Sequence, residues 1–472
     1  MKTLLLSLAL ATSSVAAYAC GGYGDFDHYT AHEWGTFTSI QGTDGVPIAW
    51  QSLVVGDLPR FVYNRTRAED AKLLGNTAEF FGKGSMAARQ RIETPVIYFY
   101  SLKPQTIDVR VDLPQGKITE WYPQISKFGP VPGEAVTPFI DPGQRDKSFI
   151  QWSKVQVIPR GNETFPSEKG GSHYYAARET DASPVQVTPP TVKEGKPTVQ
   201  NEKFLFYRGV AGFPSPLMAK TVSDNSVTMQ NQLNEPLKHL FVIDQRANEY
   251  AFSYHAELPA KQELTADISI VSSRTQTFRS RDQLIQAMKD SLTKSGLFEK
   301  ESAAMVKTWE DSWFDESGVR ILYVLPEKWV DATMPLKFTP EPAKIARVFV
   351  GRAELFTPSL EHKLTQLVKN YGAAEFDQKK VLIQSVKDLR LGRFTQAAFD
   401  RVIRLQNDKA FTTAAYELQG NALMPAPAHP PSEHTAHTKV LTAVSTSLIR
   451  SNFSPDLELL DLVLDCGALV PR

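Results

Sequence analysis

The sequence has no excess of charge of either sign. Its 472 residues include 52 lysines and arginines and 52 aspartates and glutamates, and the isoelectric point is about 7.1. It contains no basic stripe that would attract nucleic acid and no acidic tail that would attract a cationic partner. Aromatic residues make up 10% of the chain, which excludes a wholly disordered protein. These values indicate a globular protein with no nucleic-acid partner.

Cysteine is nearly absent, because the chain has only Cys20 and Cys466. A disulfide between them would join the two ends of the chain, and its long loop would stabilise the fold by roughly 4–5 kcal/mol in the chain-entropy model. Alternatively, Cys20 is the lipid-modified first residue of a lipoprotein, although Ala17 replaces the leucine usual at that position of the lipobox. In a third interpretation, the two thiols are unpaired. The sequence leaves these alternatives open.

The motifs of several enzyme classes are also missing. Gly84-Ser85-Met86 lacks the glycine spacing of a nucleophile elbow, and there is no phosphate-binding loop or dinucleotide-binding fingerprint. His32-Glu33 resembles the start of a zinc-protease helix. Such a helix needs a second histidine four residues after the first, where this chain has Thr36. The cofactor is therefore unknown, and the sequence implies none strongly.

Long hydrophobic runs are absent except near the start of the chain. Lys2 provides a positive charge, residues 4–11 an apolar stretch, and Ala17-Tyr18-Ala19 a cleavage signature directly before Cys20. Because the apolar stretch is too short to cross a bilayer, residues 1–19 are predicted to be a secretory signal peptide. We expect an exported protein without a transmembrane helix, located in the periplasm, in the medium or at the envelope.

From residue 20 to about residue 275, the patterns are those of β-strands. Apolar and polar residues alternate over residues 107–113, which predicts a half-buried strand. Residues 91–100 carry successive apolar side chains, which predicts a central strand. Residues 181–203 are rich in proline, threonine and lysine and are expected to form a long loop. The many short strands predict one or two antiparallel β-sandwiches.

The hydrophobic period becomes helical near Ser280. Ser280 and Gln283 match a capping box, and a second helix should carry Met305, Trp309 and Trp313 on one face. Strands return afterwards, so residues 276–357 are predicted to be an α+β region. Residues 358–472 are predicted to be helical, because an apolar stripe with helical spacing begins at Leu360. The expected fold class is mixed and mainly β.

Three glutamates lie among aromatic residues and are candidate catalytic groups. Strand alternation places Glu93 and Glu120 on apolar faces, and Glu33 precedes Trp34. A carboxyl group against apolar walls has a raised pKa and can act as a general acid, and two such groups can form a glycosidase pair. The structural alternative is that each glutamate binds an arginine, and four candidates are available: Arg91, Arg110, Arg178 and Arg208.

Two groups of histidines are candidate metal ligands. His28 and His32 are close in sequence and could share a metal with a distant ligand. The alternative is that both are structural and bind loop backbone. A tract with His429, His434 and His437 resembles a surface metal-scavenging segment, but its proline-rich setting argues against a preorganised site.

Three segments resemble those of an uncharacterised family of exported bacterial proteins. They are residues 32–38 (HEWGTFT), 93–100 (ETPVIYFY) and 118–123 (ITEWYP). The resemblance covers about the first 360 residues. It implies export and a shared β-rich body, and it implies no activity and no functional residue.

The leading functional hypothesis is a non-enzymatic binding or assembly role in the envelope, with a glycan or an envelope protein as ligand. The first alternative is a hydrolase of an envelope or extracellular polymer that uses Glu33, Glu93 or Glu120. The second alternative is metal handling through His28, His32 and the later histidine tract. The surroundings of the three glutamates distinguish the hydrolase from the binding protein.

Overall fold

The computed structural model describes residues 28–53, 58–65, 67, 69–70, 87–129, 148–190, 198–245, 251–268 and 280–423. The predicted signal peptide, both cysteines and the histidine tract lie outside these ranges: Cys20, Cys466, His429, His434 and His437. The disulfide, the lipid anchor and the metal-binding tract therefore stay predictions. No helix in the described ranges is long and apolar enough to cross a membrane.

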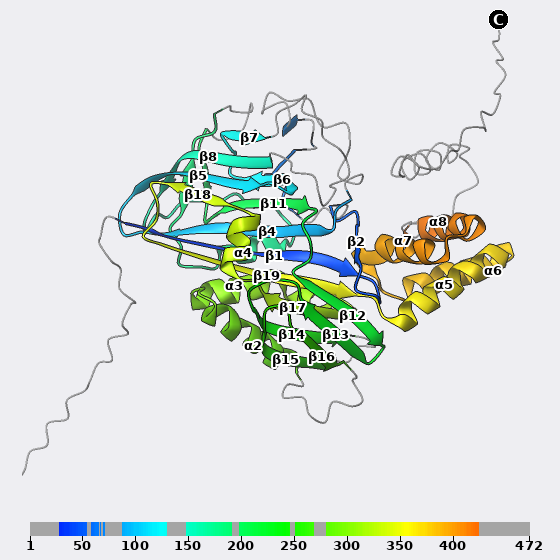
Figure 1. Cartoon of the computed structure of the whole chain (residues 1–472). Coiled ribbons are helices and arrows are strands. Elements are labelled where there is room, and N and C mark those ends of the chain that lie inside the picture. Colours follow the sequence, from blue (N-terminus) through cyan, green and yellow to red (C-terminus); the bar gives the residue numbers. More distant parts are fainter. Residues whose placement is uncertain are drawn as a thin grey trace, which may run out of the picture.

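A ten-stranded mixed sheet forms the centre of the protein (Figure 1). Only one of its strand pairs, β1 with β19, is parallel, and the other described pairs are antiparallel. Across the sheet, the strands are β15 (Ala251–Leu258), β14 (Leu237–Gln245), β17 (Gly318–Val324), β19 (Lys344–Leu355), β1 (Thr30–Gln41), β4 (Gln90–Tyr100), β11 (Leu205–Ala211), β6 (Gly116–Tyr122) and β3 (Tyr63–Asn64), with β2 (Pro47–Ile48) paired to β1.

Two smaller sheets are antiparallel throughout their described pairs. The six-stranded sheet contains β10 (Gln200–Glu202), β9 (Val185–Val187), β8 (Ser148–Val157), β5 (Gln105–Leu113) and β18 (Leu336–Thr339), with β7 (Lys127–Gly129) paired to β8. The three-stranded sheet contains β12 (Leu217–Ser223), β13 (Ser226–Asn231) and β16 (Glu263–Asp267). Strands β9 and β10 lie within residues 181–203, so the expectation of a continuous loop there is wrong.

The helices lie mainly in residues 281–423, which with the sheets confirms the mixed, mainly β fold class. The α-helices are α2 (Arg281–Lys294), α3 (Glu299–Glu310), α4 (Glu327–Thr333), α5 (Pro358–Ala373), α6 (Phe376–Lys387), α7 (Thr395–Gln406) and α8 (Lys409–Leu423). The shorter helices are η2 (His173–Arg178), η3 (Asp311–Asp315) and η4 (Gly392–Phe394). The capping box of Ser280 and Gln283 is present at the start of α2, as predicted.

The predicted α+β region shares its sheet with the β-rich body. Strands β17 and β19 belong to residues 276–357, yet they lie between β14 and β1 in the large sheet. The sheet is also mixed and not purely antiparallel, because β1 and β19 run parallel over their whole length. Parallel strands need a long connection, and here the partners are too distant in sequence for local patterns to reveal the pairing.

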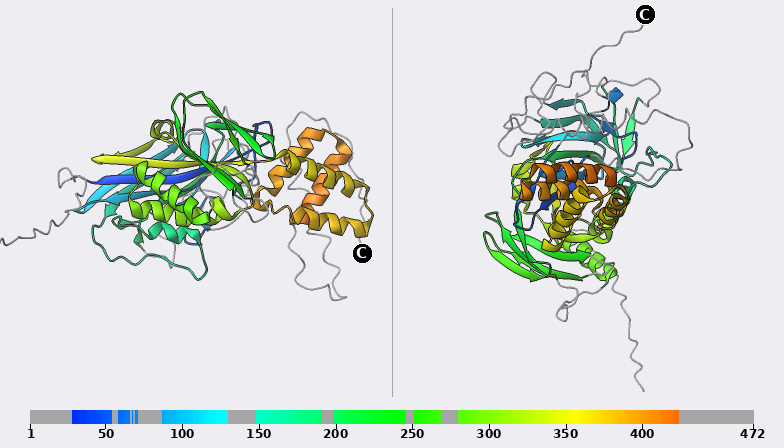
Figure 2. Two further views of the ribbon diagram at one scale, coloured as in Figure 1. Left: turned by 90° about the horizontal axis from the view of Figure 1, so that it is seen from below. Right: turned by 90° about the vertical axis from the view of Figure 1, so that its right-hand side faces the viewer.

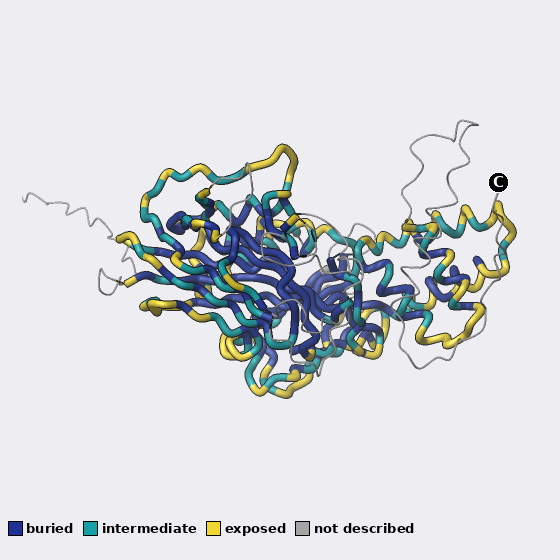
Figure 3. Tube along the Cα trace, turned by 90° about the horizontal axis from the view of Figure 1, so that it is seen from above, coloured by how far each residue is buried: buried dark blue, intermediate teal, exposed yellow. Residues whose placement is uncertain are grey.

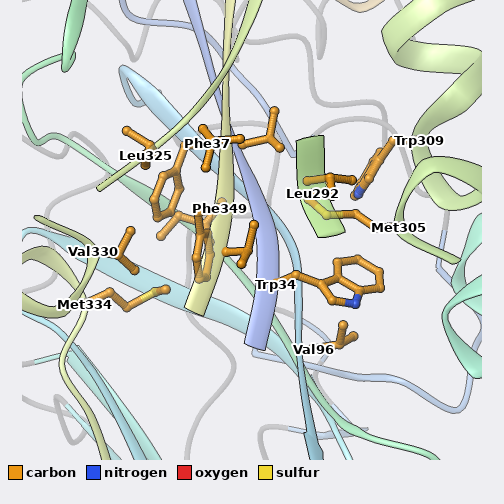
Figure 4. Close-up of a cluster of buried hydrophobic side chains, with 14 of the residues drawn as sticks. Trp34, Phe37, Val96, Leu292, Met305, Trp309, Leu325, Val330, Met334 and Phe349 are labelled. Atoms are coloured by element: carbon orange, nitrogen blue, oxygen red, sulfur yellow. The ribbon is translucent and has the colours of Figure 1, made fainter. Parts of the chain in front are cut away.

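The body has one continuous hydrophobic core, which extends on both faces of β1 and β19 (Figure 4). On one face, Phe37 of β1 stacks on Phe349 of β19 with ring centres 5.0 Å apart. On the other face, Trp34 lies towards Met305 and Trp309 of α3 (Figure 4). Trp313 is buried as well, which confirms the predicted apolar face of this second helix.

Helices α5 to α8 form a bundle beside one end of the large sheet (Figure 2). The bundle has its own hydrophobic core, which includes the predicted stripe of α5. Ile40, Trp50 and Phe356 of the body belong to this second core and join the two parts. The body is buried throughout its central strands, whereas the bundle helices expose their outer faces (Figure 3).

The close packing around β19 can be tested at Gly351. A Cβ atom at this position would lie 2.3 Å from the Tyr323 ring, so we expect Gly351→Ala to lower the free energy of unfolding by about 1–3 kcal/mol. Urea denaturation followed by tryptophan fluorescence measures the change. Gly171→Ala is the control, because a Cβ there meets nothing within 4 Å. Equal midpoints for the two variants would contradict the packing described.

Candidate functional site

Glu33 lies in β1, and its side chain is fully buried in an ion pair. Its carboxylate accepts hydrogen bonds from Tyr207 Oη at 2.6 Å and from Arg347 Nε at 2.7 Å. Burial and the nearby Glu33 carboxylate raise the pKa of Tyr207, which keeps its proton and donates it to this bond. Arg347 also donates to Asp331 at 2.8 Å. The pair therefore connects β1 to β19 and to α4.

Glu93 lies in β4, opposite Thr36 of β1. Its Oε1 accepts a hydrogen bond from Arg393 Nη1 at 2.9 Å, and Arg393 belongs to η4 at the edge of the bundle. Burial alone would raise the pKa of Glu93, but the positive charges of Arg393, Arg91 and Arg352 lower it to about 2. The expectation of a raised pKa is therefore wrong for Glu93.

Glu120 lies in β6, opposite Arg208 of β11. Arg208 donates to both carboxylate oxygens, from Nη2 at 2.9 Å and from Nε at 3.3 Å. Both side chains are only 1% exposed. The hydroxyl of Thr119 is a further hydrogen-bond partner of this carboxylate. Arg208 was among the arginines that the sequence offered as partners, whereas Arg347 and Arg393 were not.

The three candidate glutamates thus form buried ion pairs, each with a different arginine. A glycosidase pair needs two carboxyl groups on either side of one bond, one of them protonated at neutral pH. Glu93 is ionised at neutral pH because its pKa is about 2, so it has no proton to donate. The arrangement of these residues can hold elements together, and it offers no general acid at Glu93.

His32 is buried and binds a carboxylate of α3. Its Nδ1 lies 2.7 Å from Oε2 of Glu301, and its ring packs against Phe298 with ring centres 4.5 Å apart. His28 is exposed at the start of the described chain. Within the described ranges, no group of three or more histidine, cysteine, aspartate or glutamate residues is arranged to hold a metal ion. His32 thus makes a contact between β1 and α3, as a structural histidine does. Its partner is the Glu301 side chain and not the loop backbone that was expected.

A cluster of charged side chains occupies the boundary between the large sheet and the bundle. Its centre is Arg352 of β19, which donates to Glu316 at 2.6 Å and to Glu354 at 2.7 Å. Glu354 also accepts from Arg320 at 3.2 Å. Arg393 lies 3.6 Å from Glu316, so the cluster reaches Glu93 as well. We call these six residues the boundary cluster: Glu93, Glu316, Arg320, Arg352, Glu354 and Arg393.

The outer surface of the bundle carries an open groove of about 440 Å³. Helices α5 and the end of α7 form its walls, and Thr43 from the turn after β1 closes one side. Most of the residues that line it are of polar type: Thr43, Pro358, Glu361, His362, Thr365, Gln366, Lys369, Leu405 and Gln406. Arg401 and Thr43 bind the Glu361 carboxylate at 2.9 and 3.0 Å. Their hydrogen bonds fix the position of one wall.

Arg347, Arg393 and Glu301 complete three of these pairs and were not among the residues predicted from the sequence. Arg347 and Arg352 stand in the apolar run of β19, where a buried charge needs a partner. That pattern was the available signal, but it does not identify the partner. The groove residues carry no such signal, because polar residues on the outer face of a helix are ordinary.

Comparison with known proteins gives no family. No family model matches the chain, and no curated protein matches it. Among solved structures, the yeast delta-COP-I mu-homology domain matches with a TM-score of 0.25 and 6% identity, over 70% of this chain and 98% of that chain. The same domain complexed with a Dsl1 WxWxV peptide matches with the same values. At this TM-score the likeness carries no conclusion about this protein.

The ion pair of Glu93 predicts a specific pH dependence of stability. Its pKa is about 2 in the folded protein, against 4.5 for an ordinary glutamate, so the pair stabilises the fold above pH 4.5 and loses this effect as the pH falls towards 2. The difference corresponds to about 3 kcal/mol. We expect Glu93→Gln to lose about that much stability at pH 7 and to weaken less on acidification, as measured by urea denaturation at several pH values.

The control for this experiment is Glu263→Gln, because Glu263 is exposed on β16. This variant should be as stable as the unmodified protein at pH 7. It should also lose as much stability as the unmodified protein on acidification. If Glu93→Gln shows the same pH dependence as this control, the boundary cluster does not hold Glu93 in the ionised form.

Proposed function

We propose that the protein is exported and acts as a non-enzymatic binding protein of the cell envelope, and that the groove on its bundle binds an acidic segment of a partner protein. The single observation that supports this proposal is the open polar groove of about 440 Å³ between α5 and α7. The three candidate glutamates of the body are instead used in buried ion pairs between elements. Export is proposed on the sequence of residues 1–19.

The charge of the groove favours an acidic partner. The negative charge of Glu361 is balanced by Arg401 at 2.9 Å. Lys369 has no ion-pair partner among the residues that the structure describes, and its side chain is exposed at the groove. A carboxylate of a partner can therefore bind Lys369 without displacing an internal contact, and complementary charge also accelerates association.

A protein ligand is favoured over a glycan by the lining of the groove. Leu405 is 47% exposed and offers an apolar contact beside the polar groups, as protein interfaces do. None of the residues that line the groove is phenylalanine, tyrosine or tryptophan. Aromatic faces are the usual stacking surfaces for sugar rings, so the groove lacks the feature that a saccharide site would use.

A charge reversal in the groove tests the proposal. We expect immobilised protein to retain at least one protein from an envelope extract of the source cells, and a poly-glutamate peptide to compete with it. Lys369→Glu should reduce that retention by at least tenfold, because it repels an acidic segment. Quantitative mass spectrometry of the bound fraction measures the effect.

The matched control is Lys363→Glu, which reverses an exposed lysine of the same helix outside the groove. It should retain the same proteins as the unmodified chain. Retention that is equal in all three forms, or that poly-glutamate does not compete, would refute the groove as the binding site. If only glycans are retained, the ligand is a saccharide and not a protein.

A further inference from the structure

The start of helix α7 faces the boundary cluster without a side-chain cap. Phe394 occupies the cap position and has no oxygen that could accept from the first turn. The backbone N–H of Gln51 donates to the side chain of Gln396 at 3.3 Å, so the first turn of α7 lies beside the chain segment at Trp50. The N-terminus of a helix carries a partial positive charge, which favours anions.

Several buried polar groups around this helix start lack a hydrogen-bond partner. Among the residues that the structure describes, Thr36 Oγ1, Trp50 Nε1 and Arg352 Nη1 have none, and their residues are 1%, 2% and 1% exposed. Arg393 Nη2 also lacks a partner there. Each buried donor left unpaired costs about 1–3 kcal/mol, so such a concentration needs a cause.

These groups come from different elements but are close together. The guanidinium of Arg393 lies 5.9 Å from the ring centre of Trp50 and 5.0 Å from that of Phe394. The guanidinium of Arg352 lies 5.3 Å from the same Phe394 ring. Thr36 is the strand neighbour of Glu93, which binds Arg393. The donors therefore surround the start of α7 from the sheet, from the segment at Trp50 and from η4.

We propose that this site binds a small inorganic oxyanion, such as sulfate or phosphate, between the large sheet and the first turn of α7. The unpaired atoms of Arg352, Arg393 and Trp50 are donors, and a tetrahedral oxyanion has acceptors in several directions for them. The near-complete burial of Thr36, Trp50 and Arg352 excludes a large ligand. The charges of Arg393 and Arg352 also lower the pKa of Glu93.

Binding at this site connects the body to the bundle. Arg352 and Thr36 belong to β19 and β1, whereas Arg393 and α7 belong to the C-terminal part. An oxyanion held by both sets of donors strengthens the attachment that Arg393 and Glu93 already make. This role is independent of the groove, which lies at the opposite, C-terminal end of α7, at Leu405 and Gln406.

Thermal unfolding with added anions tests the proposal. Protein that has been desalted into chloride buffer is titrated with sodium sulfate or phosphate at constant ionic strength. We expect Tm to rise by about 3 °C at 100 times the Kd and to keep rising with the logarithm of the anion concentration. Trp50→Phe and Thr36→Val remove single polar groups without changing charge, and each should raise at least tenfold the anion concentration that gives the same rise in Tm.

The control is Trp152→Phe, because the indole of Trp152 donates to the Pro123 carbonyl within the body at 2.8 Å. It should lose some stability but keep the anion response of the unmodified protein. Ion chromatography of denatured, desalted protein detects an oxyanion that is too tightly bound to titrate, and about one equivalent is then expected. A Tm that rises linearly with the anion concentration and equally in all variants, together with no bound oxyanion, would overturn the proposal and leave water as the occupant.

Discussion

The parallel pairing of β1 with β19 is the contact on which the rest of the structure depends. Strand β1 lies between β19 and β4, so without it the large sheet would separate into two halves. Three kinds of interaction hold the pair: the ladder from Thr30 to Gln41, the stack of Phe37 on Phe349, and the ion pair of Glu33 with Arg347. The ion pair favours this register, because a shift by one residue would leave two buried charges unpaired.

Three of the buried pairs of charged side chains join parts of the chain that are distant in sequence. Glu33 with Arg347 joins β1 to β19, His32 with Glu301 joins β1 to α3, and Glu93 with Arg393 joins the sheet to the bundle. Such pairs are no guarantee of high stability, because desolvation offsets much of their attraction. They do make other arrangements unfavourable, and so they determine how the body and the bundle attach.

The features that local pattern determines were predictable from the sequence. The alternation in β5, the buried strand β4 and the capping box of α2 all depend on residues within one element. The parallel pair and the partners of the glutamates were not predictable, because Glu33 and Arg347 are 314 residues apart and Glu93 and Arg393 are 300 residues apart. No periodicity encodes contacts over such distances. Strands β9 and β10 were not predicted, because each has only three residues and the proline and threonine around them are typical of loops.

The pairing of β1 with β19 also has a consequence for synthesis. The first strand of the described chain has no partner on one side until residue 355 has left the ribosome, so the central sheet cannot close during most of translation. Contacts between such distant segments form slowly, because a large loop must close before they contribute free energy. We propose that this protein is exported, and a chain that is exported before it folds has to stay open until transport is complete. For such a chain, the late arrival of β19 provides that delay within the fold itself.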